Sequence, residues 1–109
     1  MKSTPFLEYI LYDIFGENEP VTARSMMGAY ALYSLGKVFA IVRDEELYFK
    51  GSKELASWYL ERKGRQFTYR KKGKDAHLNY FLVPVEVYED RNSLHEWLDV
   101  ALSVAKLPK

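Results

Sequence analysis

The stretch Arg24-Ser25-Met26-Met27-Gly28-Ala29-Tyr30-Ala31-Leu32-Tyr33 decides the fold. It is apolar and rich in tyrosine, which is typical of a β-strand with a half-buried face. A charge at its start and a glycine inside it interrupt the apolar run. Gly28 therefore predicts a bulge or a close backbone crossing between two strands. Arg24 is expected to form an ion pair with an acidic residue such as Glu8 or Asp13.

Short turns follow this stretch, and short turns imply antiparallel neighbours. Leu35-Gly36 and Asp44-Glu45 have the residue types of tight turns and separate three apolar runs. The sequence therefore predicts strands at about 22–26, 28–34, 38–43 and 47–50.

Two helices are expected around these strands. Thr4-Pro5 is typical of an N-cap followed by proline at the first helical position, and Gly16 is placed to end that helix. Between them, apolar residues recur at helical spacing: Leu7, Ile10, Leu11 and Ile14. A second helix is expected after Ser52 as its cap, with Gly64 just past its C-terminus.

The last part of the chain predicts one hairpin and one helix. Strands 67–71 and 76–83 flank the turn Lys72-Gly73-Lys74. Pro84 ends the second strand, because proline cannot donate to the ladder. Ser93 through Glu96 has the pattern of a capping box, so a third helix is expected to begin there and to end near Lys106.

The resulting element order is α-β-β-β-α-β-β-α, to which 22–26 adds a short strand before the first hairpin. An antiparallel sheet with helices packed mainly on one face is the natural arrangement, a two-layer α+β fold. At 109 residues, the chain is expected to form a single domain over 1–109.

Both faces of the predicted sheet are apolar. Tyr30 and Leu32 oppose Ala31 and Tyr33. The next strand is expected to alternate in the same way, with Phe39 and Ile41 against Val38, Ala40 and Val42. A one-sided antiparallel sheet normally alternates apolar and polar residues. We therefore expect part of the second face to be buried in a homodimer; the alternative is that helices or the N-terminal segment wrap both faces.

Cations gather in one part of the chain, which we call the basic segment, residues 62–74. It contains no acidic residue, whereas the rest of the chain holds nine cations and 15 acids. Its cations are Arg62, Lys63, Arg65, Arg70, Lys71, Lys72 and Lys74. The net charge of +1 gives no overall attraction to nucleic acid or membrane, so any electrostatic contact is local.

The basic segment suits a nucleic-acid-binding module, because hairpin-tip cations can contact phosphates and Phe67, Tyr69 and Tyr80 can stack on bases. Docking onto an acidic protein surface is a second interpretation. A purely structural one is also open, since cations complement a helix C-terminus and lysines protect sheet edges.

No catalytic signature accompanies these features, and we expect no enzyme, metal or cofactor. His77 lies between Asp75 and Asn79 on one strand face, and with Glu86 these residues form only a weak metal or proton-transfer candidate. His95 is expected on the solvent side of the last helix. A small-ligand pocket or active site lined by tyrosines remains a further alternative.

The absence of cysteine excludes disulfides, thiolate catalysis and cysteine-bound metals. The N-terminus lacks the apolar region of a signal peptide, and no apolar run approaches the roughly 20 residues of a membrane span. We therefore expect a cytoplasmic protein without membrane contact.

Several short motifs, in this order and spacing, resemble the N-terminal domain of the TfoX/Sxy competence regulators. The resemblance runs from about Phe6 to Ala105. Where the family usually has phenylalanine and a small residue around the motif glycine, this chain has Met27 and Ala29. The residues that carry the resemblance are Arg24, Met26, Gly28, Tyr33, Phe39, Tyr48, Phe67, Tyr69, Gly73, Tyr80, Pro84 and Trp97.

This resemblance implies a two-layer α+β fold similar to secretion-chaperone-like folds, with no catalytic residue. It also implies a transcriptional co-regulator of DNA-uptake genes that acts with the cyclic-AMP receptor protein. The full-length regulators carry a second, C-terminal helical domain that resembles helix-hairpin-helix DNA binders. These 109 residues lack it, so a stand-alone N-terminal domain is expected.

Overall fold

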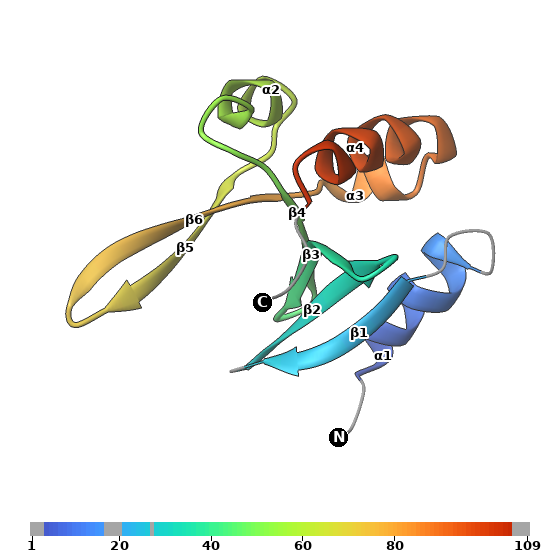
Figure 1. Cartoon of the computed structure of the whole chain (residues 1–109), viewed down its shortest axis with the longest axis horizontal. Helices are drawn as coiled ribbons and strands as arrows, with labels where there is room; N and C mark the ends of the chain where they lie inside the picture. The colour runs from blue at the N-terminus through green and yellow to red at the C-terminus, as the bar shows by residue number, and fades with distance from the viewer. Residues whose placement is uncertain (1–3, 17–20, 27, 106–109) are drawn as a thin grey trace.

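The computed structural model describes residues 4–16, 21–26 and 28–105, and it confirms the α+β class. One antiparallel sheet has the strand order β1-β2-β3-β4-β6-β5 (Figure 1). The strands are β1 (Val21–Met26), β2 (Ala29–Ser34), β3 (Lys37–Arg43), β4 (Glu46–Lys50), β5 (Gln66–Lys71) and β6 (Lys74–Leu82). The helical elements are α1 (Pro5–Glu8), the π-helix η1 (Tyr9–Phe15), α2 (Ala56–Glu61), α3 (Val85–Tyr88) and α4 (Arg91–Ser103).

Three of the strand connections are two-residue turns with positive φ at both central residues. This is the type I′ geometry, whose twist matches that of the strands it joins. The turns are Leu35-Gly36 (53° and 80°), Asp44-Glu45 (52° and 62°) and Lys72-Gly73 (52° and 78°). All three turn positions agree with the sequence-based prediction.

The helices pack on one face of the sheet, as expected. That face carries Leu32, Val42, Phe49 and Phe81, all buried in one core cluster with residues of every described helical element. Tyr59 of α2 is fully buried there and stacks on Phe81, with ring centroids 4.8 Å apart and planes 9° apart.

A β-bulge corrects the predicted facing of β3. Leu32 pairs with Ala40 and Tyr33 with Val38, so Phe39 is the extra residue. Because a bulge breaks the two-residue alternation, Phe39 joins the core on the side of Ala40 instead of facing with Ile41. It is fully buried and its ring meets that of Phe15 at 5.7 Å.

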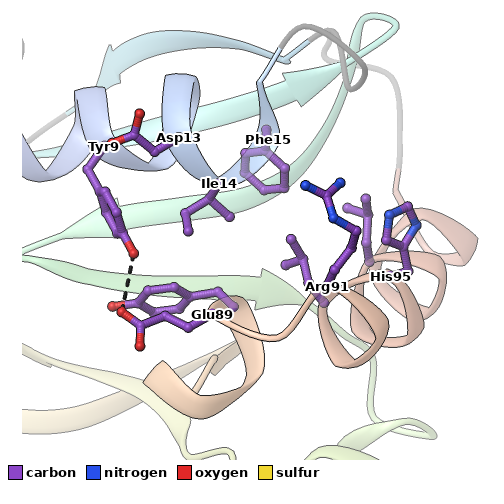
Figure 2. A pocket seen from close by; sticks show the side chains of 10 residues that line it. Tyr9, Asp13, Ile14, Phe15, Glu89, Arg91 and His95 are labelled. Carbon is purple, nitrogen blue, oxygen red and sulfur yellow. Dashed lines mark hydrogen bonds between the residues drawn. The ribbon is translucent and has the colours of Figure 1, made fainter.

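The N-terminal helix is only in part the α-helix that the spacing predicted. Thr4 caps it as expected, with its Oγ1 accepting from the Leu7 amide at 3.1 Å. From Tyr9 onward the hydrogen bonds are those of a π-helix, which ends at Gly16. The wider turn places Ile10 and Phe15, five residues apart, in the core together. Figure 2 shows η1 lying across from α3 and α4.

The caps of the later helices differ from the prediction. Asp90, not Ser93, is the N-cap of α4: its Oδ2 accepts from the Ser93 amide at 2.9 Å. The left-handed residue after α2 is Lys63 (φ 71°), not Gly64. A Cβ at Gly64 would lie 2.9 Å from the Tyr59 carbonyl oxygen, so this glycine serves close packing.

Two further differences concern the ends of elements. Ser52 accepts from the Leu55 amide at 3.1 Å, but α2 itself begins only at Ala56. The short helix α3, which the sequence did not predict, starts directly after Pro84. The predictions for Met27 and for a helix end at Lys106 fall outside the described residues.

The opposite side of the sheet, which we call the second face, has its own buried centre. Ala31 and Ile41 pair with each other there and are only 3% and 2% exposed, yet neither belongs to the core cluster. Half-buried Tyr33 and Tyr80 also lie on this face. Burial raises the pKa of Tyr80, and the neighbouring Tyr33 adds to that shift.

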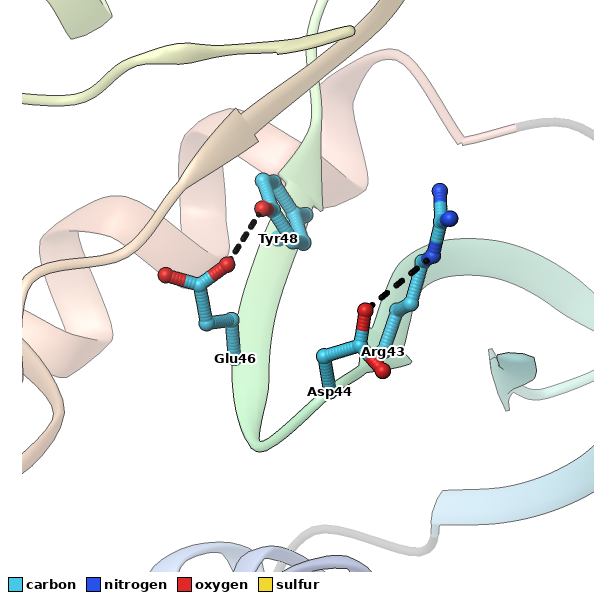
Figure 3. A network of polar contacts seen from close by, with 4 residues as sticks. All are labelled: Arg43, Asp44, Glu46 and Tyr48. Carbon is cyan, nitrogen blue, oxygen red and sulfur yellow. Dashed lines mark hydrogen bonds and ion pairs between the residues drawn. The ribbon is translucent and has the colours of Figure 1, made fainter. Parts of the chain in front are cut away.

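Polar contacts on the second face connect β4 to the start of β5. The Tyr48 hydroxyl donates a hydrogen bond to Glu46 Oε1 at 2.8 Å (Figure 3). Glu46 Oε2 lies 3.9 Å from the Arg65 guanidinium, and the Tyr48 ring meets Phe67 edge-on at 4.9 Å. Burial, followed by the hydrogen bond and charge of Glu46, raises the pKa of Tyr48 to about 12.

Gly51 should be intolerant of any side chain. A Cβ at this position would lie 2.8 Å from atoms of both the Phe81 and Tyr59 rings, which have no room to move. We expect Gly51→Ala to lower the free energy of unfolding by about 1–3 kcal/mol, as for other overpacked cores. Urea denaturation measures this. Lys53→Ala, at an exposed site two residues away, is the control and should change it by less than about 0.5 kcal/mol.

Tyr48 should make the fold sensitive to alkali. Its pKa is about 12 in the folded protein against an ordinary 10.0, so the unfolded chain releases this proton first. The stabilising contribution is complete below pH 10 and is lost as the pH rises through 12. The urea midpoint should therefore fall further between pH 9 and pH 11 in the wild type than in Tyr48→Phe. Equal falls in the two proteins would contradict the assignment.

Candidate functional site: a basic ribbon and an interhelical cleft

The basic segment lies mainly on a ribbon of two strands that extends beyond the rest of the sheet (Figure 1). β4 pairs with β6 only through Tyr48–Leu82, Phe49–Phe81 and Lys50–Tyr80. Farther out, β6 pairs with β5 alone. We call this part, residues 67–71 with 74–78 and the turn between them, the outer ribbon.

The arginines of the basic segment are held by contacts within the protein. The Arg62 guanidinium lies 4.0 Å from the Trp58 ring centroid and donates to the Trp58 carbonyl at 3.0 Å. Arg65 faces Glu46, as described above. Arg70 lies 3.7 Å from Asp75, its cross-strand neighbour, and donates to the Gly73 carbonyl at 3.3 Å.

The lysines of the outer ribbon are different. Lys71, Lys72 and Lys74 are exposed, and no acidic side chain of the described residues pairs with them. Lys71 and Lys74 stand directly opposite each other in the β5–β6 register. Like charges in that position destabilise a strand pair. Within the predicted set, the arginines therefore contact other groups of the protein, whereas these three lysines have no acidic partner among the described residues. Lys63 lies apart from the tip, at the end of α2.

The aromatic residues expected to stack on bases have structural roles instead. Phe67 is 7% exposed and packs against Tyr48, with Arg43 5.4 Å from its ring centroid. Tyr69 is half-buried beside Phe67. Lys50 Nζ lies 5.0 Å from the Tyr80 ring centroid. Electrostatic contact is therefore the chemistry that the outer ribbon offers.

A cleft of about 640 Å³ lies between η1 and the pair α3 and α4. Its apolar wall is formed by Ile14, Phe15, Leu94 and Leu98. Nothing in the sequence indicated this cleft, because its lining residues come from η1, α3 and α4, which only the fold brings together. π-Helical segments occur frequently at functional sites.

The two ends of the cleft differ in charge. At one end the Tyr9 hydroxyl donates to Glu89 Oε2 at 3.3 Å, and burial together with Glu89 raises the pKa of Tyr9. At the other end the Arg91 guanidinium reaches toward the Phe15 end of η1, with His95 beside it on α4 (Figure 2). The cleft offers the carboxylates of Asp13 and Glu89 at one end and the nitrogen-bearing side chains of Arg91 and His95 at the other.

Two tyrosines, Tyr9 and Tyr88, line this cleft, as the alternative of a tyrosine-lined pocket requires. The histidine of the cleft is His95, which is exposed on α4 and also lines the cleft. His77 is exposed on the outer ribbon, opposite Thr68. Within the described residues, no group of three His, Asp or Glu side chains is placed to hold a metal ion.

Residues of the proposed family motif are mostly structural. Phe39 and Trp97 are buried, Gly28 and Gly73 have positive φ in open space, and Pro84 separates β6 from α3. Gly28 therefore forms a turn, and no close backbone crossing requires it.

Two exposed motif residues lie on β1. Arg24 stands opposite Ala31 on the second face, and no acidic side chain of the described residues pairs with it. The predicted ion pair with Glu8 or Asp13 is therefore wrong. Met26 is 43% exposed at the end of the strand.

Comparison with known proteins agrees with these motifs. The TfoX N-terminal domain family matches residues 13–105. Protein Sxy of Escherichia coli (strain K12) is 32% identical over 71 residues, which is 65% of this chain and 34% of that protein. No described helix is long and apolar enough to cross a membrane. Because the family match covers most of the residues, the chain belongs to the TfoX N-terminal domain family.

Proposed function

We propose that this chain is a non-enzymatic regulatory domain that works through protein contacts in the control of DNA-uptake (competence) genes in the cytoplasm. The observation that carries the proposal is the family match over residues 13–105, together with the identity to Protein Sxy. The match spans only 34% of that relative, so the role concerns what this domain contributes. The partner we propose is the transcription machinery, through the cyclic-AMP receptor protein.

The geometry supports a binding role over a catalytic one. The two histidines stand on separate elements, His77 on the outer ribbon and His95 on α4. General acid–base catalysis needs groups within hydrogen-bonding reach of one another and of the substrate. Besides the cleft, the described surface offers the tyrosine-rich second face and the exposed lysines, which suit binding to a partner.

The second face supports self-association. All described helical elements pack on the other side, so the sheet itself forms this surface. Half-buried tyrosines surround its buried centre, and charged groups of Arg24 and Arg43 lie at its margin. Tyrosines around an apolar centre with a charged rim are the composition of protein interfaces. We propose that a second copy of this chain covers the face.

The dimer should dissociate when the second face receives a charge. We expect the wild type to have the mass of a dimer by multi-angle light scattering at about 100 μM, and Tyr33→Arg to have that of a monomer, because a buried unpaired charge is costly. The control is Tyr12→Arg on η1, whose side chain is already 71% exposed. A monomeric wild type, or a variant that remains dimeric, would contradict this proposal.

The partner proposal predicts a specific complex. The tagged chain, incubated with extract of its own host cells, should retain the cyclic-AMP receptor protein and RNA polymerase, detected by antibody. Retention of the purified receptor protein by the purified chain should follow. Tyr12→Arg should behave as the wild type. If neither protein is retained from extract or in purified form, the co-regulator role is wrong for this domain.

A further inference from the structure

We propose that the tip of the outer ribbon binds double-stranded DNA by placing Lys71, Lys72 and Lys74 on backbone phosphates from within the major groove. DNA binding goes beyond the protein-interaction role proposed above. Of the seven cations of the basic segment, the proposal assigns phosphate contacts to three. Three observations support it: the exposure of these lysines, their arrangement across the turn, and the two-stranded outer ribbon on which they lie.

The tip of the outer ribbon holds like charges that repel one another. Arg70 and Asp75 form an opposite-charge pair across the ribbon, with 3.7 Å between their charged groups. The next pair outward, Lys71 and Lys74, has like charges, and exposed Lys72 adds a third between them. An acidic residue at either paired position would stabilise the hairpin. The repulsion among these three lysines is a local cost to the fold, and a bound anionic partner would relieve it.

The turn itself shows a second local conflict. Lys72 has a φ of 52°, a left-handed conformation that glycine, asparagine and aspartate adopt more easily in type I′ turns. Lysine at this position costs backbone energy and adds charge to the tip. Its side chain is exposed, so packing does not explain its presence.

The shape of the ribbon favours DNA over an acidic protein. Paired strands lie about 4.8 Å apart, and the major groove of B-DNA, about 12 Å wide, admits a two-stranded ribbon. β4 does not pair with β6 beyond Tyr80, so the sheet does not block the approach. Residues 70–75 are all exposed and none is apolar.

The choice of lysine points the same way. Protein–protein interfaces are depleted in lysine and enriched in aromatic residues and arginine. In the basic segment the arginines Arg62, Arg65 and Arg70 already contact groups of the protein itself. Interfaces with DNA are more polar and more positive than those between proteins, and phosphate contacts need no apolar centre.

Fluorescence anisotropy with a fluorescein-labelled 24-bp duplex of mixed sequence tests the proposal. Three phosphate contacts predict a slope of log K against log salt of about −2.7, so affinity should fall about 40-fold between 50 and 200 mM KCl. The variant Lys71→Gln/Lys72→Asn/Lys74→Gln should lose at least about ten-fold in affinity at 50 mM KCl and bring the slope close to zero.

The matched control is Lys37→Gln/Lys53→Gln/Lys63→Asn. It removes the same charge with the same substitutions, and Lys63, like Lys72, has a positive φ of 71°. It should bind DNA as the wild type does. A single substitution, Lys71→Glu, guards against misfolding: it should raise the urea midpoint, because it converts the like-charge pair to an opposite-charge one, and still weaken DNA binding.

Three results would overturn the proposal: no binding to the duplex at 50 mM KCl, equal losses in the tip and control variants, or equal affinity for poly-glutamate and the duplex at matched charge. None of them bears on the retention of the receptor protein or on the dimer mass. Loss of the receptor complex with intact DNA binding would instead contradict the proposed regulatory role alone.

Discussion

The stacking of Tyr59 on Phe81 is the interaction on which the rest of the structure depends. It joins α2 to β6, while the Tyr59 ring also meets Trp97 of α4 at 5.3 Å. The Tyr59 hydroxyl donates to the Lys50 carbonyl at 2.8 Å, which adds the end of β4. Four elements that are separated in sequence are thus fixed by one side chain, and its burial raises its pKa because the charged phenolate would lose water.

The glycines around this ring show how closely backbone must approach it. Gly51 and Gly64, on either side of α2, leave no space for a Cβ against Tyr59. This packing also fixes where the outer ribbon begins, because the Gly51 amide donates a hydrogen bond to the Asn79 carbonyl at 2.8 Å. Beyond that residue β6 leaves β4, and the outer ribbon begins. The exposed lysines therefore stand on a base that the core holds rigidly.

Features that a local rule decides could be predicted from the sequence. Gly16, Gly73 and Pro84 end or turn elements by backbone geometry alone, and their positions could be predicted. Features in which tertiary packing overrides the local pattern could not be predicted. The bulge at Phe39 depends on the partner strand, and η1 depends on packing Ile10 and Phe15 into one core.

The candidate site follows the same division. The clustering of cations at 62–74 is visible in the sequence, but which of them are engaged depends on distant residues such as Glu46 and Trp58. Only the fold shows that Lys71 faces Lys74. The cleft had no sequence signal, because it forms between η1 and the pair α3 and α4, and α3 was not predicted.

The like-charged lysines of the outer ribbon lower the stability of a domain whose interior is otherwise well paired. The core leaves no buried side-chain nitrogen or oxygen without a hydrogen-bond partner among the described residues, so the interior is fully satisfied. Unfavourable features at the surface include the like-charge pair Lys71–Lys74 and the left-handed backbone of Lys72 in the outer ribbon. Leu35, Glu45 and Lys63 also have a left-handed backbone. A fold whose described interior has no unsatisfied buried polar side chain can tolerate a small repulsion between surface charges. At the surface, solvent and salt screen this repulsion, and a bound anion would relieve it. The like-charge pair lies at the tip of the outer ribbon, away from the packed helices, and this position connects it to binding rather than to folding.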